Sequence, residues 1–181
     1  MKKIIILLSC AFLLVGCQNN EPEVTPTVTP TVTPEGVEPT PGVESELSPL
    51  ATVVDTIRSN HESFSHQHQL LVEPQLLEGA YGINDEKREM MKDFVIFAPM
   101  MNTKSNEIIV IDAIDGNQEA LKELILTRQS VIQSNFETYL PDQLEIAKNY
   151  VLVEDETLLI FVIDENAKAI ADEILVGLKG K

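Results

Sequence analysis

Cysteine is scarce in this chain of 181 residues. The sequence contains two cysteines, Cys10 and Cys17, and both lie close to the N-terminus. The chain beyond residue 17 therefore has no disulfide, no cysteine nucleophile, no thiolate zinc site and no iron–sulfur cluster.

Basic residues are also few, since 13 Lys and Arg stand against 29 Asp and Glu and give a net charge of −16. Nucleic-acid binding through phosphate neutralisation requires a basic surface, so we exclude it. The same charge argues against electrostatic adhesion to anionic lipids. The sequence contains no P-loop, dinucleotide fingerprint, GxSxG elbow or HExxH motif, and we expect no cofactor.

The N-terminal residues are typical of an export signal. Lys2 and Lys3 precede an apolar run over residues 4–15, which only Ser9 interrupts with a polar side chain. A membrane-spanning helix needs about 20 apolar residues, so this run is too short to span a bilayer. A short apolar run behind two lysines predicts a signal peptide.

The apolar run ends in Leu14-Val15-Gly16-Cys17. This motif resembles the lipobox of bacterial lipoproteins. The resemblance implies cleavage after Gly16 and attachment of diacylglycerol, with fatty-acyl chains such as palmitate, to the sulfur of Cys17. Several acyl chains on one residue give firm membrane anchoring. We therefore predict a signal peptide over residues 1–16 and a lipid anchor on the outer, extracytoplasmic face of the cell membrane. An ordinary secretory signal is the alternative.

Residues 17–48 combine the expected lipidated cysteine with a segment rich in Thr, Pro and Glu. A Val-Thr-Pro-Thr repeat places Pro26, Pro30 and Pro34 four residues apart, which forbids helix and interrupts sheet ladders. The segment has no large apolar residue before Leu47, so it cannot build a core. We predict a disordered linker that reaches roughly 95 Å when extended at about 3.1 Å per residue. Its threonines are also candidates for O-glycosylation.

Residues 49–181 are long enough for one core, and their pattern predicts a single α+β domain. Helices are expected near residues 50–57, 85–91, 117–138 and 170–178, with a short irregular or helical stretch over residues 76–83 and a short turn or helix after Pro141. Strands are expected over residues 94–98, 108–113, 150–153 and 158–163. This ββα-ββα order predicts a mostly antiparallel four-stranded sheet with helices packed on it.

Residues 114–117, Ile-Asp-Gly-Asn, recur 49 positions later as Ile-Asp-Glu-Asn at residues 163–166. Either the ββα unit is duplicated, or the two segments are alike by chance because each joins the end of a strand to the cap of a helix. The strands themselves are continuous apolar runs, which predicts that both faces of the sheet are covered. N-terminal helices could supply the second cover, or that face could be an interface with a partner or a second copy.

Three histidines, His61, His66 and His68, lie close together and are the only ones in the chain. With Glu62 they could bind zinc. Their segment is polar and loop-like, however, so we expect solvated loop histidines, no metal site and no catalytic residue.

Two loops carry the residues that we consider candidates for ligand binding, because connecting loops rich in hydrogen-bonding groups often hold function. The alternative for both loops is a structural turn. The candidate residues are Met100, Met101, Asn102 and Glu107 in one loop, and Tyr139 and Asp142 in the other.

The same loops carry a family resemblance. Pro-Met-Met-Asn (99–102), Asn-Glu-Ile (106–108) and Tyr-Leu-Pro-Asp-Gln (139–143) resemble a family of uncharacterised lipoproteins of Gram-positive bacteria with a domain of unknown function. The likeness covers residues 76–178. It implies location and domain limits, and it implies no activity, cofactor or catalytic residue.

The sequence as a whole predicts a lipid-anchored extracytoplasmic protein of the cell envelope with a small binding or interaction domain rather than an enzyme. Its expected partners are the membrane through the lipid anchor, and a protein partner or a second copy, with no nucleic acid. Two alternatives remain open. One is a cell-envelope hydrolase that uses carboxylates or the histidines. The other is a substrate-binding accessory of a transporter, although such proteins usually need two lobes around a cleft.

Overall fold

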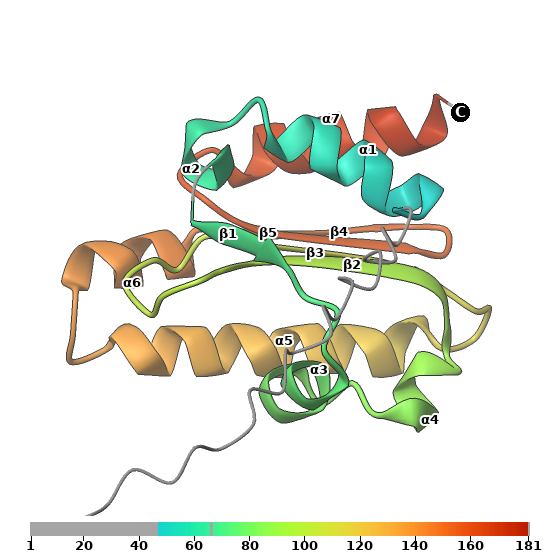
Figure 1. Ribbon diagram of the computed structural model, residues 1–181, viewed down its shortest axis with the longest axis horizontal. Helices are drawn as coiled ribbons and strands as arrows, with labels where there is room; N and C mark the ends of the chain where they lie inside the picture. The colour runs from blue at the N-terminus through green and yellow to red at the C-terminus, as the bar shows by residue number, and fades with distance from the viewer. Residues whose placement is uncertain (1–46, 66, 181) are drawn as a thin grey trace, which may run out of the picture. The chain divides into compact units, whose positions relative to one another are not determined.

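The computed structural model describes residues 47–65 and 67–180 (Figure 1). All of them belong to one compact unit. The predicted signal peptide, Cys17, nearly all of the linker, and His66 lie outside the described residues, so those predictions stay untested.

In the described part of the chain, five strands form one antiparallel sheet in the order β1-β2-β3-β5-β4. The strands are β1 (His68–Leu70), β2 (Met91–Pro99), β3 (Glu107–Ala113), β4 (Tyr150–Asp155) and β5 (Leu158–Ile163). The prediction of an antiparallel sheet is confirmed, but the prediction of four strands is wrong. The additional strand, β1, has three residues at the sheet edge and pairs Leu70 with Phe97 of β2.

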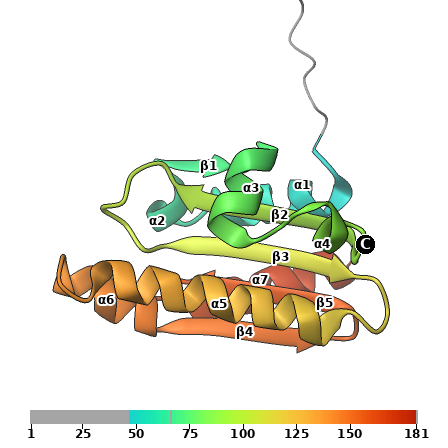
Figure 2. The same cartoon turned by 90° about the horizontal axis from the view of Figure 1, so that it is seen from below.

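Helices cover both faces of this sheet. On one face lie α1 (Pro49–Arg58), α2 (Glu62–Ser65) and α7 (Ala167–Lys179) (Figure 1). On the other face lie α3 (Pro74–Tyr81) and α5 (Gln118–Phe136), which cross in front of the strands in Figure 2. Helix α6 (Pro141–Lys148) lies at the end of the sheet and packs against α5 and the same core (Figure 1). The short helix α4 (Asp85–Arg88) leads into β2.

The apolar strands build two cores, one on each side of the sheet. Along β3, Ile109 and Ile111 belong to the core under α5, whereas Ile108 and Val110 belong to the core under α1 and α7. All four side chains are fully buried. The prediction of cover on both faces is therefore confirmed, and the C-terminal helix α7 supplies the second cover together with α1. Neither sheet face is left for a partner.

The two helices α1 and α7 approach each other closely at Gly177 of α7. A Cβ atom added there would lie only 2.9 Å from Cγ1 of Val53 and 3.0 Å from Cδ1 of Ile57, both on α1. Glycine at this position removes the side chain that would separate the helices. The cover over the second core is thus a packed helix pair.

The order strand–strand–helix does occur twice, in β2-β3-α5 and, after α6, in β4-β5-α7. Because β3 and β5 are adjacent and antiparallel, a rotation about an axis perpendicular to the sheet would superimpose the two hairpins. That rotation would place both helices on one face, whereas α5 and α7 pack on opposite faces. The fold therefore gives no support to a duplicated ββα unit.

Candidate functional site

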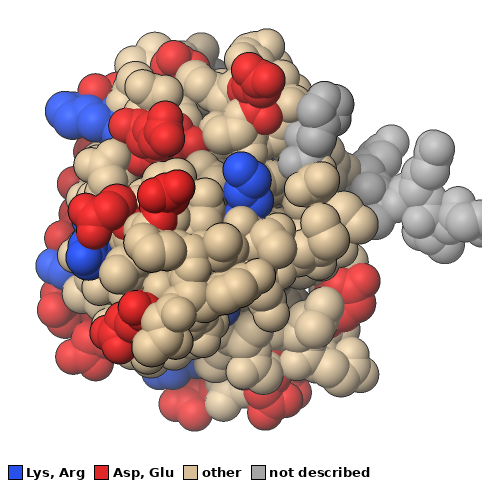
Figure 3. Space-filling view, turned by 90° about the vertical axis from the view of Figure 1, so that its left-hand side faces the viewer, with Lys and Arg blue, Asp and Glu red and all other residues tan. Residues whose placement is uncertain are grey.

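A cavity of about 510 Å³ opens at the end of the sheet where β3 begins and β5 ends. Its walls include His61, Gln67, His68, Lys104, Asn106 and Asp164. The volume falls within the range of small-ligand pockets. Figure 3 shows this end of the molecule, where acidic side chains lie around a broad uncharged area and basic side chains are few.

Two buried polar side chains form the inner part of this cavity. Asn106 and Asp164 are 5% and 2% exposed, and Nδ2 of Asn106 donates a hydrogen bond of 2.8 Å to Oδ2 of Asp164. The other carboxylate oxygen of Asp164, Oδ1, accepts a 2.7 Å bond from the backbone N–H of Asn166. Since each oxygen of this buried carboxylate has a donor, the pair is held in one orientation.

The side-chain carbonyl oxygen of Asn106, Oδ1, accepts no hydrogen bond from the described residues. Among the described residues, every fully buried side-chain nitrogen or oxygen does have a hydrogen-bond partner. Oδ1 must therefore keep contact with solvent, and the cavity is the space that Asn106 lines. The cavity thus contains an acceptor held on a side chain that is 95% buried.

The histidines in the cavity wall are held by neighbouring groups. Nε2 of His61 lies 3.0 Å from Oε2 of Glu173, and Nε2 of His68 lies 3.0 Å from the backbone oxygen of Asn106. The ring of His68 also packs against Phe64, with 4.9 Å between the ring centroids. The expectation of a solvated loop is therefore wrong for His68, which belongs to β1. Among residues 47–65 and 67–180 there is no group of three or more His, Cys, Asp or Glu side chains placed to hold a metal ion.

Charged side chains line the more exposed part of the cavity. Lys104 is exposed and makes no ion pair with any described residue. The carboxylates of Glu62 and Glu165 likewise have no side-chain partner in the described part of the chain. The cavity therefore presents one ammonium group and two carboxylates whose charges are not paired within the protein.

The two candidate loops are joined to each other, but none of the six predicted residues lines the cavity. The backbone N–H of Ser105 donates a 2.9 Å bond to Oε1 of Gln143, and the Ser105 hydroxyl donates a 2.9 Å bond to the Gln143 backbone oxygen. Five of the six predicted residues are exposed and lie outside the cavity wall. Four are on the loops, Met100, Met101, Asn102 and Tyr139, and Asp142 is in the first turn of α6. The cavity instead uses Lys104 and Asn106 from the same stretch, and the prediction missed their role.

Glu107, the sixth predicted residue, is fully buried on the face of the sheet that α3 and α5 cover. Its Oε1 and Oε2 accept bonds of 3.0 and 2.6 Å from Nε and Nη2 of Arg128. Oε2 also accepts a 3.0 Å bond from the Tyr81 hydroxyl. The guanidinium of Arg128 lies 4.4 Å from the centroid of the Tyr81 ring. This buried triad uses the Glu107 carboxylate within the protein, so Glu107 is a structural residue rather than a ligand-orienting one.

Burial and charge shift the pKa values of two members of the triad. Burial, and then the negative charge of Glu107, raise the pKa of the Tyr81 hydroxyl far above its ordinary value. Burial lowers the pKa of the Arg128 guanidinium, but the hydrogen bonds and charge of Glu107 outweigh burial, so that pKa is raised as well. Tyr81 therefore stays neutral and Arg128 stays charged throughout the physiological pH range.

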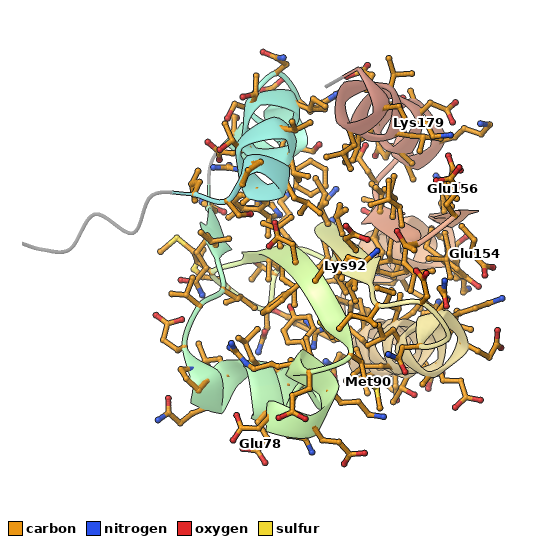
Figure 4. All side chains as sticks on the ribbon, turned by 90° about the vertical axis from the view of Figure 1, so that its right-hand side faces the viewer. Glu78, Met90, Lys92, Glu154, Glu156 and Lys179 are labelled. Carbon is orange, nitrogen blue, oxygen red and sulfur yellow. The ribbon has the colours of Figure 1, made fainter. Side chains whose placement is uncertain are left out.

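The opposite end of the sheet carries ion pairs on its surface (Figure 4). Lys122 lies 2.7 Å from Glu154, Lys92 lies 3.5 Å from Asp112, and Lys179 pairs with Asp155. Exposed pairs of this kind contribute about 0–1 kcal/mol each. These three lysines are thus paired with carboxylates, in contrast to Lys104 at the cavity.

Comparison with known proteins identifies a family. A family model described as Domain of unknown function (DUF4358) matches residues 62–164, which is more than half of the chain. No curated protein and no solved structure matches. The matched region starts at α2 and ends at Asp164, so it differs from the limits 76–178 that the resemblance implied and leaves α1 and α7 outside.

Proposed function

The chain belongs to the family described as Domain of unknown function (DUF4358), and we propose that it is a lipid-anchored protein of the outer face of the cell membrane whose α+β domain binds a small polar ligand. The observation that carries the binding part of this proposal is the buried Asn106–Asp164 pair, which leaves an acceptor facing a cavity of about 510 Å³.

The anchor is supported by the sequence. Two lysines, a short apolar run and Leu14-Val15-Gly16-Cys17 occur in the order that lipoprotein signals require. In the part of the chain that the structure describes, no helix is long and apolar enough to cross a membrane. Acyl chains on Cys17 would hold the protein at the membrane.

Ligand binding is supported by the acceptor at the cavity. Oδ1 of Asn106 has no partner within the described protein and keeps contact with the solvent in the cavity. Water or a ligand must fill that role. Since Asp164 fixes the amide, a ligand would meet a preorganised acceptor, which lowers the cost of ordering on binding.

We expect Cys17→Ala to abolish incorporation of a fatty-acid analogue and to release the protein from the membrane fraction. The sulfur of Cys17 is the atom that receives the lipid in this proposal. Cys10→Ala is the matched control, because it removes the other cysteine from within the predicted signal peptide and should leave labelling intact. Persistent labelling of Cys17→Ala would contradict the anchor.

The binding part is tested with the purified full chain in detergent and a panel of sugars, nucleosides, amino acids and short peptides. We expect at least one compound to shift the amide NMR signals of Lys104, Asn106 and Glu165, while the signals of Lys122 and Glu154 at the far end stay in place. If every compound leaves the cavity signals unchanged, the proposed ligand site is wrong.

A further inference from the structure

We infer that the ligand of this cavity is an amino acid or a short peptide that carries both a free ammonium group and a free carboxylate. This inference rests on the proposed binding function and specifies the class of ligand. It is drawn from the charges that the cavity leaves unpaired and from the acceptor on Asn106.

The first observation is the unpaired lysine. The domain surface is rich in carboxylates, and other exposed lysines use them: Lys148 lies 2.8 Å from Glu145, and Lys168 lies 2.8 Å from Asp172. Lys104 forms no such pair with the described residues, although it lines a cavity with Glu62 and Glu165. Its ammonium group is thus available to a carboxylate of the ligand.

The second observation is the excess of acceptors around that lysine. The side chains of Glu62 and Glu165 are unpaired within the described residues, and Oδ1 of Asn106 lacks a donor. An ammonium group has three N–H donors and no acceptor, so it complements this set. A peptide N–H could serve Asn106 in the same way.

These observations favour a ligand with both charges over simpler ligands. A purely anionic ligand such as phosphate would bind Lys104 but would face Glu62, Asp164 and Glu165. A purely cationic ligand would pair with the carboxylates but would leave Lys104 without a partner. An apolar ligand would leave the buried amide of Asn106 without a donor, which costs binding free energy. A ligand with both charges satisfies the lysine and the acceptors together.

The experiment compares three mixed-sequence tripeptide libraries for retention by the immobilised full chain in detergent. One library has free termini, one is N-acetylated and one is C-amidated. We expect the free library to be retained best, and each cap to weaken retention about tenfold or more, because each cap removes a charge-assisted interaction. A mixed sequence removes any dependence on one particular side chain.

Variants of the protein test which side chain binds each terminus of the peptide. Lys104→Met should remove the difference between free and amidated libraries, and the double variant Glu62→Gln with Glu165→Gln should remove the difference between free and acetylated libraries. Lys168→Met and Glu145→Gln are the matched controls on the exposed surface, and both should behave as the parent protein.

Equal retention of all three libraries would overturn the inference and leave the binding proposal standing. The inference also fails if no library is retained while another compound of the solute panel shifts the cavity signals. If neither libraries nor solutes bind, the proposed function fails together with the inference. Retention that survives Lys104→Met unchanged, with the preference for a free carboxylate intact, would show that the ligand binds elsewhere.

Discussion

Replacement of Arg128 by methionine is expected to lower the free energy of unfolding by about 3–5 kcal/mol. The reason is that Glu107 is fully buried and accepts two hydrogen bonds from the Arg128 guanidinium. Without the arginine, a charged carboxylate would remain in the core with only the Tyr81 hydroxyl as a partner. Urea unfolding followed by circular dichroism measures the loss.

Two variants separate this effect from the loss of a large side chain. The triple variant Tyr81→Phe, Glu107→Leu, Arg128→Met removes the whole buried triad, and it should recover most of the stability, because an apolar replacement of a buried ion pair is often neutral. Lys122→Met breaks an exposed ion pair of the same helix and should cost no more than about 1 kcal/mol. A triple variant as unstable as Arg128→Met would contradict the assignment of the loss to an unpaired charge.

The region that matches the family model, residues 62–164, is not expected to fold by itself. This fragment lacks α1 and α7, which bury one face of the sheet. Six apolar strand side chains on that face would become exposed: Val95, Phe97, Ile108, Val110, Ile160 and Val162. At about 1.5–3 kcal/mol for each buried side chain, the loss is on the order of 10 kcal/mol, which equals the whole stability of a typical domain.

The comparison fragment is residues 47–181, which keeps both helices. We expect it to unfold cooperatively and at the same denaturant midpoint as the full chain, since the described residues contain both cores. Fragment 62–164 should bind a hydrophobic dye and lack a cooperative transition. A sharp unfolding transition of fragment 62–164, with no dye binding, would contradict the structural role assigned to α1 and α7.

The parts of the fold that the sequence predicted are those with strong local patterns. The uninterrupted apolar run of β5 indicated a buried strand covered on both sides, and the residues of that strand do divide between the two cores. The pattern of residues 117–138 indicated the long helix α5. Strand β1 was missed because three residues, with polar His68 and Gln69 among them, form no detectable alternation and are held by backbone pairing to β2.

The candidate site was harder to predict because its key contacts join distant positions. Asn106 and Asp164 are 58 residues apart, and their pairing depends on the register that sets Glu107 opposite Ile163. A prediction that paired β3 with β5 would have placed these two polar residues side by side at one end of the sheet. Glu107 was predicted to bind a ligand because its actual partner, Arg128, lies 21 positions away on another element and could not be identified from the sequence.

The placement of Pro49 has a mechanical consequence for a tethered protein. Pro49 and Leu50 line a hollow with Thr157 and Leu158, where β5 starts, whereas the ligand cavity lies where β5 ends. If the protein is tethered through Cys17 as we propose, tension along the linker would enter the domain at the start of α1, at the end of the sheet remote from Asn106 and Asp164.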